Sequence, residues 1–136
     1  MTTPIRLAAL LLLCSTPVAA QEAAVPTREV AVAIDSGFLD NPTAAASVVW
    51  SQDVTVPGAS AGQWLQLRFA DTHLPGGSRL RIFAAETPTE AQWHDAHSIV
   101  DYRYWSCQFV GPTVRVELLA APGSAANRTR VDLVKV

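Results

Sequence analysis

A serine flanked by glycines is the first group of residues in this chain that could do chemistry. Gly58-Ala-Ser60-Ala-Gly62 matches the G-x-S-x-G string of a nucleophile elbow. An elbow needs a buried strand before the serine and a helix after it, so that the hydroxyl is exposed on a sharp turn. Here Pro57 opens a turn, and an alternating segment, residues 64–69, follows. We therefore interpret residues 58–62 as a loop between two strands.

A Ser-His-Asp triad could be assembled from Ser60 together with His73 or His97 and Asp71 or Asp101. A working triad requires a histidine that a carboxylate orients and that faces the hydroxyl. Nothing in the sequence marks one of the three histidines in this way. The sequence therefore predicts no catalytic residue, and a small hydrolase that uses Ser60 is the least favoured function.

Two segments have residue types that bind metal ions. His94 and His97 have the H-x-x-H spacing, which places both on one face of a helix, and Asp95 or Asp101 could be a third ligand. Because the H-E-x-x-H string is absent, we interpret them as surface histidines in a loop. Residues 35–41 are rich in Asp and Asn, but the glycine falls at the third position of this segment, which favours an Asx-type turn over a calcium loop. We expect no metal and no cofactor.

Four aromatic residues lie close together in the least regular part of the sequence: Trp93, Tyr102, Tyr104 and Trp105. An exposed row of aromatic rings on a β-sandwich can stack sugars or anchor a protein interface. The commoner use of such residues is to fill the core or close one end of the sandwich. These four residues are the candidate binding site, and both interpretations remain open at this stage.

The elements that must position these residues are short β-strands. Apolar and polar residues alternate in short segments separated by Gly- and Pro-containing turns, a pattern typical of an antiparallel sandwich or barrel rather than of βαβ units. The predicted strands are residues 29–34, 48–56, 64–69, 79–83, 114–118 and 129–136, the last with Val131 and Leu133 on one face. Residues 89–96 could form a helical turn, and residues 98–105 a strand or an irregular bridge. The N-x-T sequon at 127–129 indicates a surface loop.

The first twenty residues have the features of a signal peptide. Arg6 supplies a basic start, residues 7–13 form an apolar stretch too short to span a bilayer, and small residues precede a predicted cleavage site between Ala20 and Gln21. Lipidation at Cys14 is the rival interpretation, but Leu13 stands where a small residue is required. We expect a signal peptide at 1–20, a flexible lead-in at 21–28 and one domain at 29–136, in a secreted or periplasmic protein.

Charge and cysteine content exclude some functions. Removing 20 of the 136 residues leaves 116, with nine cations and twelve acidic residues. This balance argues against nucleic-acid binding, and no polybasic run predicts binding to an anionic membrane. We expect no stable membrane insertion. Cys107 would be alone in the mature chain and could form no internal disulfide, so we expect a buried thiol.

Two stretches resemble a known family. The segment WSQDVTVPGASAGQWLQLRFADTHLPGGSRLRIF (50–83) and the tail VRVELLAAPGSAANRTRVDLVKV (114–136) resemble the non-catalytic region that precedes the peptidase domain in secreted bacterial trypsin-like and lysyl-endopeptidase-like serine proteases. The resemblance implies a jelly-roll-like, P-domain-like sandwich of about seven or eight strands. It carries over no catalytic residue, because the family's catalytic residues lie in the peptidase domain downstream, and this chain ends at Val136.

The resulting expectation is a secreted, non-catalytic accessory domain that binds a secreted serine protease or a cell-surface polymer. The alternative from a second class is a carbohydrate-binding module, which requires the aromatic residues to be exposed. We do not expect an enzyme.

Overall fold

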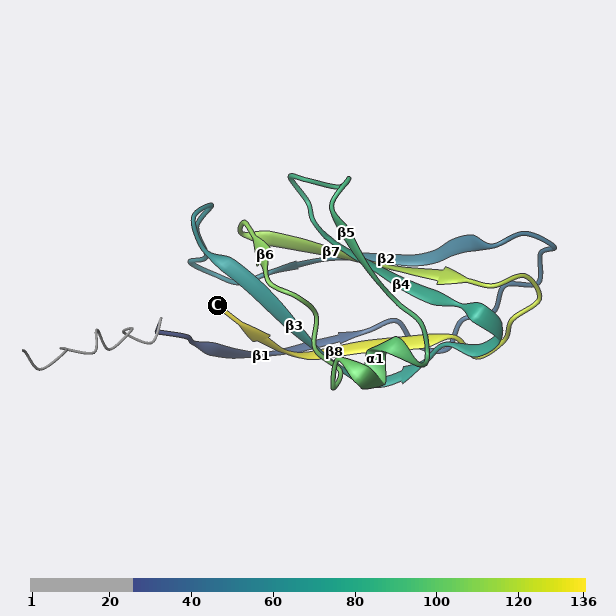
Figure 1. The fold of residues 1–136 in the computed structure, drawn as a ribbon. Helices are drawn as coiled ribbons and strands as arrows, with labels where there is room; N and C mark the ends of the chain where they lie inside the picture. The colour runs from purple at the N-terminus through teal and green to yellow at the C-terminus, as the bar shows by residue number, and fades with distance from the viewer. Residues whose placement is uncertain (1–25) are drawn as a thin grey trace, which may run out of the picture.

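Eight β-strands in two four-stranded antiparallel sheets make up the domain in a computed structural model, which describes residues 26–136 (Figure 1). The predicted signal peptide and most of the lead-in lie outside these residues. One sheet has the strand order β1-β8-β3-β6 and the other β2-β7-β4-β5. The bounds are β1 Glu29–Asp35, β2 Ser47–Thr55, β3 Trp64–His73, β4 Arg79–Ala84, β5 Ala91–His94, β6 Phe109–Val110, β7 Thr113–Ala120 and β8 Arg128–Lys135, with a 3-10 turn η1 at Pro75–Gly77 and a short helix α1 at Ser98–Asp101.

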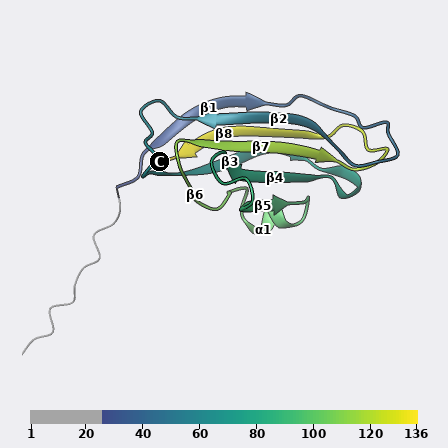
Figure 2. The same cartoon turned by 90° about the horizontal axis from the view of Figure 1, so that it is seen from above.

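This strand order is that of a jelly roll. Nearly every connection crosses from one sheet to the other, and the β4–β5 hairpin stays within one sheet. Strands that are distant in the sequence therefore become neighbours, such as β1 beside β8 and β2 beside β7. Figure 2 shows β5 and α1 along one long side of the sandwich and β1 on the opposite side. The all-β antiparallel sandwich predicted from the sequence is confirmed.

The core lies between the two sheets and follows from the period of two. In β3, Leu65, Leu67 and Phe69 are buried while the residues between them are partly exposed. The inward residues of β7 and β4 face them from the other sheet, as predicted: Val114, Val116, Leu118, Leu80 and Ile82. Because alternate side chains of a strand point to opposite faces, each strand buries one apolar row and leaves the other row at the surface.

The last strand departs from the predicted pattern. Val131 and Val134 are both fully buried, whereas Leu133 is partly exposed and pairs with Ala31 and Arg68. Between Leu133 and Val131 the pairing with β3 shifts by one residue, which is a β-bulge. A bulge changes the face on which the following residues lie, so the prediction that Leu133 shares the inner face with Val131 is wrong.

The segment between β4 and β6 also differs from expectation. Residues 91–94, which the sequence suggested as part of a helical turn, form the edge strand β5, in which Gln92 pairs with Ile82. Residues 98–101, suggested as strand or bridge, form the single helical turn α1. Pairing with the strongly alternating β4 overrides the weak local helical preference of this stretch.

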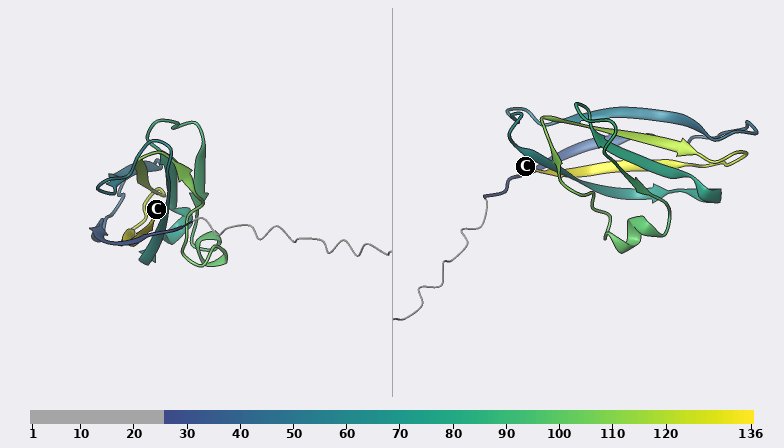
Figure 3. Two further views of the ribbon diagram at one scale, coloured as in Figure 1. Left: turned by 90° about the vertical axis from the view of Figure 1, so that its left-hand side faces the viewer. Right: turned by 45° about the horizontal axis from the view of Figure 1, so that its top comes forward.

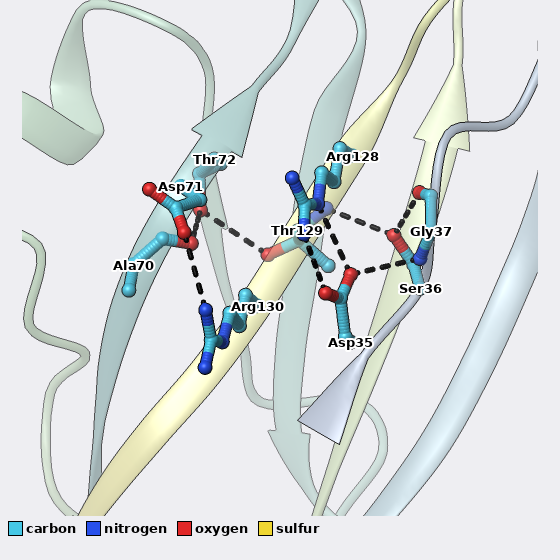
Figure 4. Close-up of polar contacts among 9 residues, drawn as sticks. All are labelled: Asp35, Ser36, Gly37, Ala70, Asp71, Thr72, Arg128, Thr129 and Arg130. Atoms are coloured by element: carbon cyan, nitrogen blue, oxygen red, sulfur yellow. Dashed lines mark hydrogen bonds and ion pairs between the residues drawn. The ribbon is translucent and has the colours of Figure 1, made fainter. Parts of the chain in front are cut away.

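A network of ion pairs joins β8 to its neighbours at one end of their sheet (Figure 4). The Arg128 guanidinium donates two hydrogen bonds to the Asp35 carboxylate, at 3.1 and 2.6 Å, and holds the pKa of Asp35 at about 2. The Gly37 N–H donates to Asp35 Oδ1 at 2.9 Å, which confirms the predicted Asx-type turn. On the other side of β8, Arg130 contacts Asp71 at 3.3 Å. These groups tie β1, β3 and β8 together.

Two buried asparagines hold the loops at the same end of the sandwich. Asn127 is fully buried, and its side-chain amide donates to the Leu39 carbonyl and to Ser124 Oγ, both at 3.0 Å. The prediction that the sequon at 127–129 marks a surface loop is therefore wrong at the asparagine itself. Asn41 Nδ2 donates to the carbonyls of Ala45, Ala120 and Ala121. Both side chains replace the water that these buried backbone groups have lost.

No helix within residues 26–136 is long and apolar enough to cross a membrane.

Candidate functional site

A single irregular segment, residues 95–108, joins the two sheets along one long side of the sandwich; we call it the strap. It leaves β5, forms α1, passes along β3 and ends at β6, and α1 stands out from the side of the domain (Figure 3). The Phe69 N–H donates to the Tyr104 carbonyl at 2.7 Å, and the Ser106 N–H donates to the Leu67 carbonyl at 2.9 Å. The strap thereby covers the edge of β3 that β6 leaves unpaired.

The buried hydroxyl of Ser106 fastens the strap more firmly. Ser106 Oγ accepts the Leu67 N–H at 2.9 Å and donates to the Cys107 carbonyl at 2.6 Å. Gln66 Nε2 donates to the Ser106 carbonyl at 2.8 Å. An edge strand without partners would present a row of free N–H and C=O groups, and these bonds satisfy them.

The start of α1 is fixed by Asp95. Its Oδ1 accepts the N–H groups of His97 and Ser98, at 3.0 and 2.7 Å, and Ser98 Oγ accepts the Asp95 N–H at 2.9 Å. These hydrogen bonds lower the pKa of the Asp95 carboxyl. After α1, Arg103 and Tyr104 both have positive φ angles, 52° and 62°. Two successive left-handed residues without glycine turn the chain sharply, and the side chains on this turn are exposed.

Three of the four predicted site residues are exposed, Trp93 on β5 and the two tyrosines on the strap. The exposed fractions are 45% for Trp93, 55% for Tyr102 and 39% for Tyr104, and the apolar Val100 of α1 is exposed to 52%. We call these four residues the aromatic surface. The interpretation that the aromatic residues fill the core is wrong for Trp93, Tyr102 and Tyr104, because none of the three is buried.

Trp105 is placed differently. It is half-buried, and its ring lies against cations on the outer face of the β1-β8-β3-β6 sheet: Lys135 Nζ is 4.4 Å and Arg68 Cζ 5.9 Å from the ring centre. Its backbone bridges to Arg68 of β3. Trp105 therefore packs the strap against the sheet by cation–π contacts.

Trp93 of β5 has arginines of β4 beside it. Arg79 Cζ lies 5.2 Å and Arg81 Cζ 5.9 Å from the Trp93 ring centre. Arg81 is paired with Glu117 of β7 at 3.1 Å, whereas within the described residues Arg79 has no ion-pair partner. The Arg79 guanidinium, which has no carboxylate partner within the described residues, thus borders Trp93 of the aromatic surface.

The two histidines with the H-x-x-H spacing lie in different environments. His94 ends β5 and is fully buried, while the His97 side chain is 91% exposed and lies 3.7 Å from the Asp101 carboxylate. No group of three potential metal ligands occurs within residues 26–136. The prediction that both are surface histidines is correct for His97 and wrong for His94. Treating residues 91–94 as a strand paired with β4 would have placed His94 inward.

Two adjoining hollows form a groove between β5 and the residues that lead into β6. Their volumes are about 390 and 280 Å³, and they share Glu90, Gln108 and Phe109 as lining residues. Cys107 lies in this groove and is exposed, so the prediction of a buried thiol is wrong. Its N–H donates to Gln92 Oε1 at 2.7 Å, and partial desolvation raises the pKa of the thiol.

The serine of the G-x-S-x-G string lies in the loop between antiparallel strands β2 and β3, as predicted. The Ser60 N–H donates to Gln63 Oε1 at 2.9 Å, and the Gln63 N–H donates to the Ser60 carbonyl at 3.1 Å. No hydrogen bond joins Ser60 to a histidine in the part of the chain that the structure describes, and His73 Nδ1 lies 2.8 Å from the Ala126 carbonyl.

These features define a jelly-roll domain of two antiparallel sheets with an exposed tryptophan on β5 and two exposed tyrosines on the strap. Comparison with known proteins gives no closer assignment, because no family model, curated protein or solved structure matches this chain.

Proposed function

We propose that the domain is a secreted, non-catalytic binding module and that its aromatic surface contacts a partner protein. The observation that carries the proposal is the exposure of Trp93 on β5 and of Tyr102 and Tyr104 on the strap, three large aromatic side chains that the core does not use. Tryptophan, tyrosine and arginine dominate the energetics of protein interfaces, because a large rigid ring buries much area and loses little conformational entropy on binding.

A secreted serine protease is the partner that the sequence favours. The stretches 50–83 and 114–136 resemble the non-catalytic region of secreted bacterial serine proteases, and the sandwich class implied by that resemblance is the class this chain has. A domain that accompanies a protease needs a contact surface and no catalytic group of its own. The aromatic surface, bordered by Arg79, offers such a contact.

Binding to a purified trypsin-like protease secreted by the same source would test the proposal. The protein spanning residues 21–136 should bind with a dissociation constant in the micromolar range or below, measured by interferometry. Trp93→Ala and Tyr102→Ala should each weaken binding by about tenfold or more, as expected for central aromatic contacts. The matched control is Phe38→Ala, because Phe38 is 67% exposed and belongs to the β1–β2 connection rather than to β5 or the strap.

An equal loss of affinity in Phe38→Ala and Tyr102→Ala would contradict the placement of the contact. No binding by the unchanged protein at 100 micromolar would count against a protease partner.

Carbohydrate binding is the second candidate. Trp93 is half exposed at the edge strand β5, where a sugar ring could stack on an aromatic side chain. Adding soluble oligosaccharides of bacterial cell-surface polymers should then change the tryptophan fluorescence, and Trp93→Ala should abolish the change. Fluorescence that no sugar alters would remove this candidate while leaving the protein-binding proposal intact.

A further inference from the structure

His94 is a buried titratable group with an incomplete set of hydrogen-bond partners. The side chain has no exposed surface, and its Nε2 is the one buried side-chain nitrogen or oxygen atom within residues 26–136 that has no hydrogen-bond partner. Its Nδ1 lies 3.4 Å from Ser98 Oγ, and the Tyr102 ring packs against the imidazole edge to face, with the ring centres 5.0 Å apart. Both contacts come from the strap.

The surroundings of His94 offer little to stabilise a positive charge. From α1 and the turn after it, the facing groups are the Ser98 hydroxyl and the Tyr102 ring, and from β4 the paired residue is the apolar Leu80. Farther along the strap, the Trp105 backbone favours the protonated ring, but it makes no hydrogen bond to Nε2.

The nearest acid, on the strap immediately after β5, is Asp95. Its carboxylate also favours protonation of His94, but it already accepts the N–H groups of His97 and Ser98. The other histidine and acid of α1 and its N-terminus are His97 and Asp101, whose side chains lie 3.7 Å apart and are 91% and 63% exposed, so that solvent screens them from His94.

Desolvation is accordingly the largest influence on the pKa of His94. It lowers the pKa of His94 below the ordinary value of 6.5, against the smaller opposing effects of Trp105 and Asp95. A histidine released from the strap into water would regain its ordinary pKa.

We propose that His94 is a pH-sensitive latch: the neutral ring holds the strap against β5, and protonation in acid releases the strap and disperses the aromatic surface. The residues that pack on His94 or follow it in the strap, Tyr102 and Tyr104, are also residues of the aromatic surface. Only the consequence of the latch, the loss of partner binding in acid, rests on the proposed function. The release of the strap itself requires no partner.

The direction of the effect follows from proton linkage. The open strap binds a proton at His94 more readily than the closed strap, because the closed form has the lowered pKa. The closed form is therefore fully favoured above pH 6.5 and loses stability as the pH falls below that value. The ratio of open to closed strap should rise by up to about tenfold per pH unit until the pH reaches the lowered pKa.

Hydrogen exchange measured from pH 7 to pH 5, expressed as protection factors, tests the latch. Protection of the strap amides of Tyr102, Tyr104 and Ser106 should fall over this range, by up to about 25-fold for an open-state pKa of 6.5, while amides of the central strand β7 keep theirs. In His94→Leu, which removes the titrating ring, strap protection should not depend on pH. The control His97→Gln changes a neighbouring exposed histidine and should behave like the unchanged protein.

A nuclear magnetic resonance titration of the three histidine rings gives a second readout that does not depend on the folding of His94→Leu. The His94 ring should titrate below pH 6.5, and the Tyr102 ring signals should move with it. Strap protection that is constant from pH 7 to pH 5, an equal fall in His94→Leu, or a His94 pKa at or above 6.5 would each overturn the proposal.

Partner binding separates this inference from the proposed function. If no partner binds at either pH but the strap opens in acid, the latch stands and the proposed function fails. If a partner binds through Tyr102 equally at pH 7 and pH 5 while the protection factors fall, the regulatory step is wrong and the binding function stands.

Discussion

At the scale of single residues, the buried asparagines show how much this fold depends on a few polar side chains. Asn41 is 1% exposed, and its Nδ2 donates to three backbone carbonyls from two different segments. A carbonyl that loses both its partner and its access to water raises the free energy of the folded state. Buried amides of this kind therefore fix the loops at this end of the sandwich.

Replacing Asn41 should test this directly. Asn41→Ala should lower the free energy of unfolding by about 1–3 kcal/mol, the usual loss when buried hydrogen-bonding groups are left unsatisfied. Urea unfolding followed by circular dichroism measures the change. The control is Gln52→Ala, because the Gln52 side chain is exposed and donates to the neighbouring Asp53 carbonyl. A loss in Asn41→Ala no larger than in the control would contradict the role given to Asn41.

The ion pair between Arg128 and Asp35 should contribute to the fall in the free energy of unfolding at acidic pH. The pKa of Asp35 is lowered from 3.8 to about 2, first by the hydrogen bonds from Arg128. The stabilisation is therefore complete above pH 3.8 and is lost as the pH falls towards 2. Asp35→Asn should show a shallower loss of stability between pH 4 and pH 2 than the unchanged protein.

A carboxyl titration by nuclear magnetic resonance checks the same pair independently. An Asp35 pKa near 3.8 would contradict the structure at this position.

At the scale of elements, the sequence predicts best where alternation is strong. The inward rows of β3, β4 and β7 follow directly from Leu65, Leu80 and Val114 and their neighbours at intervals of two. The stretch 89–105 could not be predicted, because β5 has only four residues and depends on pairing with β4, and because α1 is a single turn whose start depends on hydrogen bonds to the Asp95 carboxylate. The bulge in β8 depends on its pairing with β3, which leaves no local signal in the sequence.

The residue types of the candidate site could be predicted from the sequence, but their exposure could not. The aromatic residues between positions 93 and 105 indicate a candidate binding site, whereas the exposure of their side chains depends on how the strap leaves β5 and turns at Arg103 and Tyr104. The burial of His94 and the exposure of Cys107 have the same origin, since both follow from an edge strand that the sequence did not reveal.

We expect the strap to open separately from the rest of the domain, because it is held mainly through Ser106. Ser106→Ala removes the acceptor of the buried Leu67 N–H and should lower the free energy of unfolding by about 1–3 kcal/mol. It should also reduce the protection of strap amides more than that of β7 amides. Ser51→Ala is the control, because Ser51 is exposed on β2. Equal loss of protection in the strap and in β7 would show that the strap does not open separately.

At the scale of the whole molecule, the jelly-roll order makes the two sheets interdependent. Apart from the β4–β5 hairpin, consecutive strands alternate between the sheets, so neither sheet is a continuous segment that could form alone. The core residues between them are contributed by both sheets: Leu67, Phe69 and Val131 from one, and Leu80, Ile82 and Leu118 from the other. No disulfide reinforces this arrangement within residues 26–136, where Cys107 is free. Apolar burial must supply most of the stability.

A pair of leucine substitutions on neighbouring strands tests both the shared core and the bulge in β8. Leu67→Ala should lower the free energy of unfolding by about 2–5 kcal/mol, because Leu67 is fully buried between the sheets and truncating its side chain leaves a cavity. Leu133→Ala should cost less than about 1.5 kcal/mol, because the bulge leaves Leu133 on the outer face. In both variants, unfolding followed by tryptophan fluorescence and by far-ultraviolet circular dichroism should coincide, since Trp50 and Trp64 report on different sheets. Equal losses in the two variants would place Leu133 in the core, and separate transitions would show that one sheet persists without the other.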